Sequence, residues 1–250
     1  MNTAEKLTAI AENQKKVYDK GRDDLLDVLW ENIQNSGKRT NYREAFCHKD
    51  QTYMYSWKVW TDEFFAPKYD FKITDAYRMF QNAGIRDLKG CLAKHGVTID
   101  LGGCKTASSV DMTFYFSNIE ELPEVNVSNV PGRLVETICW NERLKKVDKV
   151  ILSPDGNQTF YNTFTNNKQL TDIIFEGKFG HSVNFNGTPL NVASMKSLIS
   201  CLKDYSVENT GVNILTLTDQ CKTALEAEGA TSPNGNLWTE YVSDLGWVLA

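Results

Sequence analysis

The sequence predicts an α+β solenoid that has a helical segment at its N-terminus and an α/β cap at its C-terminus. Three observations support this class: an apolar pattern that recurs three times between residues 116 and 175, an amphipathic pattern at the start of the chain, and alternating helix and strand patterns after residue 190. Repeats of about 20 to 50 residues are typical of solenoids, in which each unit buries its apolar face against the next. The chain therefore divides into four regions: residues 1–38, 39–76, 77–190 and 191–250.

The repeat becomes visible when three segments are aligned on their first apolar residue. The segments are FSNIEELPEVNV, ICWNERLKKVDKVIL and FTNNKQLTDIIF, and they begin 22 and 26 residues apart. In each one a Leu follows the first residue by six positions, and a Val or Ile follows it by nine. A half-buried β-meander also places apolar residues at intervals, but three copies with the same two offsets favour a solenoid. The predicted repeat core is Phe116, Leu122, Val125, Ile138, Leu144, Val147, Phe164, Leu170 and Ile173.

This pattern resembles the BspA-type leucine-rich repeat. In that repeat an aromatic residue, small polar residues and a Cys or Asn precede a Leu and a short β-strand. FTNNKQLTDIIF fits closely and FSNIEELPEVNV fits well, whereas the middle copy departs from the pattern because Ile138 replaces the Phe. A looser copy, YRMFQNAGIRDL, carries Phe80, Ile85 and Leu88. The resemblance implies a leucine-rich-repeat solenoid over residues 77–190.

The first region has the pattern of an amphipathic helix or helical hairpin. Asn2 and Glu5 resemble a capping box, and Gly21 is expected to weaken the helix or to split it in two. Apolar residues recur at a spacing close to a heptad, and the candidate assembly seam is Leu7, Ile10, Val17, Leu25 and Val28. Two interpretations remain open. The segment is either a hairpin that packs on its own domain or an attachment and oligomerisation arm.

The second region, residues 39–76, is dense in Tyr, Trp and Phe and has no regular period. One interpretation is an irregular cap over the open end of the solenoid, and the other is a contact face. The candidate contact aromatics are Tyr53, Tyr55, Trp57 and Trp60. Capping is the favoured interpretation, because the end units of a solenoid have to be covered to keep the protein soluble.

The last region, residues 191–250, alternates between helix and strand patterns. Apolar residues at helical spacing, potential N-cap residues and glycines after each apolar run predict where the helices begin and end. The expected elements are a helix capped by Asn191, a strand from Ile214, a helix capped by Asp219, a helix from Leu237 to Leu245 and a final strand at residues 247–249. Together they predict an α/β cap that extends and closes the repeat sheet.

The two ends of the chain carry a second resemblance. The start MNTAEKLTAIAENQKKVYDKG and the end, with PLNVASMKSLISCLKDYS and WTEYVSDLGWVLA, are similar to repeat proteins encoded in tail regions of phages and prophages of gut Firmicutes. Members of that group often have Pro in the first helix, where this chain has Gln14 and Lys15. The resemblance implies a virion protein of the tail or baseplate, made in the bacterial cytoplasm. It implies no catalytic residues.

The same resemblance implies the kinds of partner to expect. These are other virion proteins, further copies of the chain, and a host cell-surface protein or glycan. The alternative function is a bacterial cell-surface adhesion or protein-interaction module with the same repeats. The start of the chain has no apolar stretch typical of a signal peptide, which counts against that alternative.

Composition and motifs exclude several other classes of protein. A net charge of −5 disfavours binding to nucleic acid, which requires a basic face. No apolar run approaches the roughly 18 residues of a membrane span. The six cysteines are scattered without a metal-binding or disulfide spacing, and reduced packing thiols are expected. The chain lacks phosphate-binding, zinc-protease and hydrolase motifs, so the sequence predicts a non-enzymatic protein without a cofactor.

Overall fold

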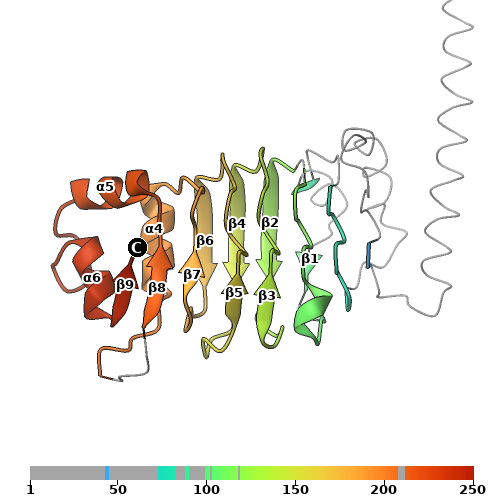
Figure 1. Cartoon of the computed structure of the whole chain (residues 1–250), viewed down its shortest axis with the longest axis horizontal. Helices are drawn as coiled ribbons and strands as arrows, with labels where there is room; N and C mark the ends of the chain where they lie inside the picture. The colour runs from blue at the N-terminus through green and yellow to red at the C-terminus, as the bar shows by residue number, and fades with distance from the viewer. Residues whose placement is uncertain are drawn as a thin grey trace, which may run out of the picture.

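The computed structural model describes residues 43–44, 73–82, 88–89, 99–101, 103–117, 119–207 and 212–250. These residues form a mixture of helices and strands with open parallel sheets (Figure 1). The candidate assembly seam, Leu7, Ile10, Val17, Leu25 and Val28, lies outside the described residues. The candidate contact aromatics Tyr53, Tyr55, Trp57 and Trp60 lie outside them as well. The predictions made for these residues therefore stay predictions.

The described elements are short strands, one 3-10 helix and three α-helices, and the α-helices lie near the C-terminus. In chain order they are β1 (Ile99–Asp100), the 3-10 helix η2 (Ala107–Ser109), β2 (Glu121–Asn126), β3 (Arg133–Val135), β4 (Lys146–Ile151), β5 (Thr159–Tyr161), β6 (Asp172–Glu176), β7 (Val183–Asn184), α4 (Val192–Ser200), β8 (Asn213–Thr216), α5 (Asp219–Ala227), α6 (Trp238–Asp244) and β9 (Trp247–Leu249).

All strand pairs among these elements are parallel. The first sheet has the order β1-β2-β4-β6, the second pairs β3 with β5, and the third has the order β7-β8-β9. From residue 121 to residue 176 the chain therefore passes alternately through the first and the second sheet. Figure 1 shows β3 below β2 and β5 below β4, so that each turn of the chain lies beside the next. This arrangement is compatible with the predicted solenoid, which stays a prediction.

The strand register corrects the alignment of the first repeat copy. Leu122 lies opposite Val147, and Val147 lies opposite Ile173. The sequence alignment pairs Leu122 with Leu144 instead, and it is wrong at this position. Glu121 lies opposite Lys146, so Ile119, which is buried, takes the place equivalent to Leu144.

The aromatic position of the first copy is shifted too. The amide of Phe114 donates to the Thr137 carbonyl of the next turn at 2.9 Å. The amide of Ile138 donates to the Thr163 carbonyl of the turn after that at 3.0 Å, so Phe114 and Ile138 occupy equivalent positions. Phe114 is buried, whereas Phe116, the predicted core residue, is partly exposed. The other eight predicted core residues are buried: Leu122, Val125, Ile138, Leu144, Val147, Phe164, Leu170 and Ile173. The turn from Phe114 to Ile119 is one residue shorter than the equivalent turn in the middle copy, so a fixed offset selects the wrong Phe.

Aromatic side chains fill the space between the sheets. The rings of Phe80 and Phe114 stack with centroids 5.5 Å apart, and those of Phe164 and Phe185 stack at 5.0 Å. Phe175 meets the edge of the Phe164 ring at 5.5 Å. Offset and edge-to-face packing of this kind adds to the free energy gained from burial. Two groups of stacked rings, with the aliphatic Ile138 between them, therefore belong to one core that runs through successive turns of the chain.

A buried row of polar side chains joins the turns that precede the first sheet. The Asn141 amide nitrogens, main-chain and side-chain, both donate to Oδ1 of Asn167, at 3.1 and 3.2 Å. Asn141 Oδ1 in turn accepts from the main chain and the hydroxyl of Ser117, both at 2.8 Å. Buried backbone groups need such partners, because an unpaired one raises the free energy of the folded state. Asn141 and Asn167 occupy the Cys or Asn position of the repeat pattern that the chain resembles.

Helix α4 covers the outer edge of β6. The Ser194 hydroxyl accepts from the Ile173 amide at 2.8 Å, and the Ser197 hydroxyl accepts from the Phe175 amide at 2.9 Å. These hydroxyls take the place of carbonyls on a further strand. Unpaired strand edges favour association with other chains, and the two serines remove that edge from the surface.

The predicted C-terminal elements are found, with one correction. Asn191 caps α4 by accepting from the Ser194 amide, and the helix and strand expected after residue 237 are present as α6 and β9. Asp219, however, does not cap α5. The Thr218 hydroxyl accepts from the Cys221 amide at 3.2 Å, and Asp219 is the first residue of the helix. An acidic residue in the first turn is favourable to the helix dipole, so both positions suit Asp and the sequence does not distinguish them.

The described cysteines, Cys104, Cys139, Cys201 and Cys221, are free and buried. Burial raises the pKa of Cys201, so that its thiol stays protonated at neutral pH. None of the helices that the described residues form has the length and apolar character that a membrane crossing requires.

Candidate interaction site

The turns that lead into the first sheet lie side by side and share an unusual backbone. Phe116 and Trp140 have φ angles of 53° and 58°, in the left-handed region. The Phe116 amide donates to the Cys139 carbonyl at 3.2 Å, and the Trp140 amide donates to the Thr165 carbonyl at 3.0 Å. By the same pattern of hydrogen bonds, the equivalent residues of the flanking turns are Asn82 and Asn166, whose φ angles are 55° and 58°.

Aromatic side chains reach the surface at two of these four positions. Trp140 is 42% exposed, and Phe116 is partly exposed. Tyr115 lies beside them, with its ring centroid 6.1 Å from that of Phe116. Burial and the nearby Glu136 carboxylate raise the pKa of Tyr115, so its phenol stays neutral and keeps its proton at physiological pH. We refer to Tyr115, Phe116 and Trp140 as the turn aromatics.

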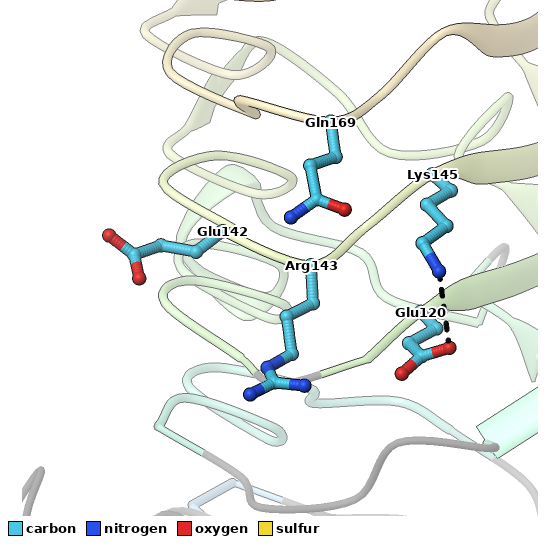
Figure 2. A pocket seen from close by; sticks show the side chains of 5 residues that line it. All are labelled: Glu120, Glu142, Arg143, Lys145 and Gln169. Carbon is cyan, nitrogen blue, oxygen red and sulfur yellow. Dashed lines mark ion pairs between the residues drawn. The ribbon is translucent and has the colours of Figure 1, made fainter.

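A polar hollow of about 360 Å³ lies on the same turns, immediately before the strands of the first sheet (Figure 2). Its lining side chains all end in charged or amide groups: Glu120, Glu142, Arg143, Lys145 and Gln169. Figure 2 shows the Lys145 ammonium directed at the Glu120 carboxylate, and the two atoms are 3.6 Å apart. Glu142 extends away from the other four side chains and pairs with Lys168 at 3.0 Å.

The outward face of strands β2, β4 and β6 carries a network of ion pairs, which we call the charged face. Lys149 lies between Glu124 at 3.3 Å and Glu176 at 3.2 Å, and so connects all three strands. Lys89 lies between Glu121 at 3.1 Å and Asp148 at 2.9 Å. Each lysine therefore bridges carboxylates from different parts of the chain.

Protonation on the charged face follows these contacts. The hydrogen bond to Asp148 raises the pKa of Lys89. Burial opposes ionisation of Asp148, but hydrogen bonds from Lys89 and Lys146 outweigh it and lower the pKa of that carboxyl. The hydrogen bonds to Glu176 and Glu124 raise the pKa of Lys149. These contacts therefore favour the charged forms of Lys89, Asp148 and Lys149.

The site residues predicted from the sequence that the structure describes lie mostly inside the fold and not on these surfaces. The predicted repeat core lies inside, apart from Phe116, which belongs to the turn aromatics. Trp140 and the hollow were not predicted, because their recognition depends on the register between turns. The sequence alignment gives no signal for them, because it places Phe116 opposite Ile138 and so two positions before Trp140.

These surfaces can bind a partner through hydrogen bonds, ion pairs and aromatic packing. Among the residues that the structure describes, no group of three or more His, Cys, Asp and Glu side chains is placed to hold a metal ion. Comparison of the chain with protein-family models, with curated proteins and with solved structures gave no significant match. The proposals below therefore rest on the described contacts and on the resemblances in the sequence.

Proposed function

We propose that this chain is a non-enzymatic virion protein of a phage tail or baseplate, with a leucine-rich-repeat scaffold that binds other virion proteins or the host surface. The resemblance of both chain ends to phage tail-region proteins supports the choice of particle. The open parallel sheets support the choice of scaffold, because stacked turns present long, regular faces for contact with other macromolecules.

The charged face is the observation that carries the proposal. Exposed ion pairs contribute little to stability, usually less than about 1 kcal/mol each, so the fold does not require a network of them. Across an interface, in contrast, an ordered pattern of charges selects the partner and its orientation. Four carboxylates, from Glu121, Glu124, Asp148 and Glu176, pair with Lys89, Lys146 and Lys149 on this face. Asp172, exposed on β6 opposite Lys146, adds a fifth. A partner with a basic contact surface fits this excess of acidic groups.

Purified particles test the proposal directly. Prophages of the producing strain are induced, the particles are banded on a density gradient, and the fractions are probed with an antibody against this chain. We expect the protein to band with the tail proteins. Its absence from the particles, together with its release by protease from intact uninduced cells, would instead support a cell-surface adhesion module.

A further inference from the structure

We propose that the turn aromatics and the polar hollow together form a binding site for a neutral oligosaccharide. The inference rests on the proposed function, since a glycan of the host surface is the ligand that such a site on a virion protein would meet. It places a binding site on the turns of the repeat body and names the chemical class of its ligand, which the resemblance does not specify.

Four neighbouring turns share one left-handed backbone position, which is filled by Asn in two turns and by an aromatic residue in the other two. A left-handed backbone costs an ordinary residue about 1–2 kcal/mol, and Asn tolerates it best among residues with a side chain. Asn82 and Asn166 fill the position in the flanking turns, whereas Phe116 and Trp140 fill it between them. Burial does not offset the cost at Trp140, which is 42% exposed. Left-handed φ angles also occur four residues before each of these positions, so this backbone belongs to the fold, and the choice of an exposed aromatic side chain is what points to a binding role.

The turn aromatics lie on adjacent turns of the chain. Phe116 and Trp140 belong to adjacent turns joined by backbone hydrogen bonds, so their backbones lie about 4.8 Å apart, the usual spacing of neighbouring strands. The ring of Tyr115 extends the surface on one side of Phe116. The C–H groups on the face of a pyranose ring carry partial positive charge and pack on the negative face of an aromatic ring. Adjacent exposed aromatics therefore suit adjacent sugar units.

The polar hollow lies on the same turns as the turn aromatics. Trp140 and Arg143, which lines the hollow, belong to the same turn and are three residues apart, so their Cα atoms are within about 11 Å of each other. All five lining side chains offer hydrogen-bond donors or acceptors, and none is aliphatic. A ligand rich in hydroxyl groups fits this lining, because each hydroxyl both donates and accepts a hydrogen bond.

The charge of the hollow decides between neutral and ionic sugars. Glu120 and Glu142 contribute two carboxylates, and Arg143 and Lys145 contribute two cations. The lining therefore has no net charge. A polyanion such as a phosphate-bearing wall polymer needs a basic surface. A neutral sugar instead uses both donors and acceptors, and this hollow supplies both.

The test uses the full chain and a printed array of neutral, sialylated, sulfated and phosphate-bearing oligosaccharides, with the strongest neutral ligand then titrated by calorimetry. We expect neutral oligosaccharides to bind. Trp140→Asn and Arg143→Gln should each weaken the binding about tenfold or more, since aromatic and Arg side chains dominate the affinity of binding sites. Tyr161→Thr is the matched control, because Tyr161 is an exposed aromatic outside the site, and it should leave the affinity unchanged.

Thermal melts separate binding from folding. Because Asn already stands at this position in two turns, Trp140→Asn should melt within about 2 °C of the parent or above it. Binding of only anionic sugars, unchanged binding by Trp140→Asn, or a melting point several degrees lower would each overturn the inference. If no sugar binds but the protein bands with particles, the glycan site is wrong and the virion proposal stands. If sugars bind but particles lack the protein, the virion proposal is wrong and the glycan site stands.

Discussion

At the scale of single residues, burial rather than sequence spacing decides which side chains stabilise this fold. Leu144 and Leu170 are both fully buried in the repeat core, whereas Ile174 is 56% exposed on the charged face. All three are large aliphatic residues on or beside strands of the first sheet. Their energetic contributions should therefore differ in proportion to the apolar area that each removes from water.

We predict that Leu144→Ala and Leu170→Ala each lower the free energy of unfolding by about 2–5 kcal/mol, because each leaves a cavity in a packed core. Ile174→Ala is the matched control and should change it by less than about 0.5 kcal/mol. Urea denaturation followed by circular dichroism measures all three. Equal stability of the Leu170→Ala variant and the parent would show that the repeat column is not core.

The same residues show what the sequence predicts well and where it fails. Eight of the nine predicted core residues are buried, because apolar residues at constant offsets have to lie on one face of a repeated unit. Phe116 is the exception. Two Phe residues, Phe114 and Phe116, stand two positions apart, and only the hydrogen bonds between turns identify Phe114 as the one that packs inside. The turn aromatics could not be found from one sequence for the same reason.

At the scale of elements, the helix α4 and strand β6 form a unit in which serine hydroxyls complete the hydrogen bonding of the strand. Ser194 is buried, and its hydroxyl both accepts from Ile173 and donates to the Thr171 carbonyl at 3.0 Å. Ser200, at the end of the same helix, is exposed, and its hydroxyl donates to the Lys196 carbonyl of the same helix.

We predict that Ser194→Ala lowers the free energy of unfolding by about 1–3 kcal/mol, because it leaves the Ile173 amide buried without a partner. Ser200→Ala should have an effect of less than about 0.5 kcal/mol. Amide hydrogen exchange gives a second readout, in which Ile173 should lose protection in the Ser194→Ala variant alone. Comparable losses of stability in both variants would mean that the hydroxyl of Ser194 is not the strand partner.

The charged face makes a prediction about pH. The folded-state pKa of Asp148 lies below its ordinary value of 3.8, so its carboxylate stabilises the fold above that value. The contribution is lost as the pH falls through the lowered folded-state pKa. Asp148→Asn should therefore lower stability at pH 6.5 by up to about 1 kcal/mol and by less at pH 3. Urea melts at low salt measure the difference, and an effect that grows on acidification would contradict the assignment.

Element prediction was most successful where helical spacing and caps coincide, as in α4 and α6. The two strands of the second sheet, β3 and β5, and strand β7 of the third sheet were not predicted. Strands β3 and β5 have three residues each, and β7 has two, which is too few for an alternating pattern to stand out from chance. Their position depends on pairing with turns that are about 25 residues away in the chain, which a local pattern does not report.

At the scale of the whole molecule, the described residues form a body of stacked turns, and residues 1–38 are the predicted assembly segment. The body has its own core, and helix α4 with the strands and helices that follow it covers one end. A single helix of this length is marginal in water, so the apolar seam predicted in residues 1–38 needs a surface to pack against. That surface belongs to another virion protein, to another copy of the chain or to the body of the same chain.

We predict that a chain that begins at residue 39 remains folded but no longer self-associates or enters particles. Sedimentation measures the first property, and banding of particles from a complemented deletion strain measures the second. An insoluble truncated chain would place the seam in the core. A truncated chain that assembles as well as the full one would show that the seam has another role.

The most direct test of the central claim is a cryo-electron microscopy map of the banded particle. The account predicts density for the repeat body in the tail or baseplate, with the charged face of β2, β4 and β6 against a basic surface of a neighbouring protein and with Trp140 on the outside of the particle. A map that accounts for all tail density without this chain would contradict the claim that it is a virion protein.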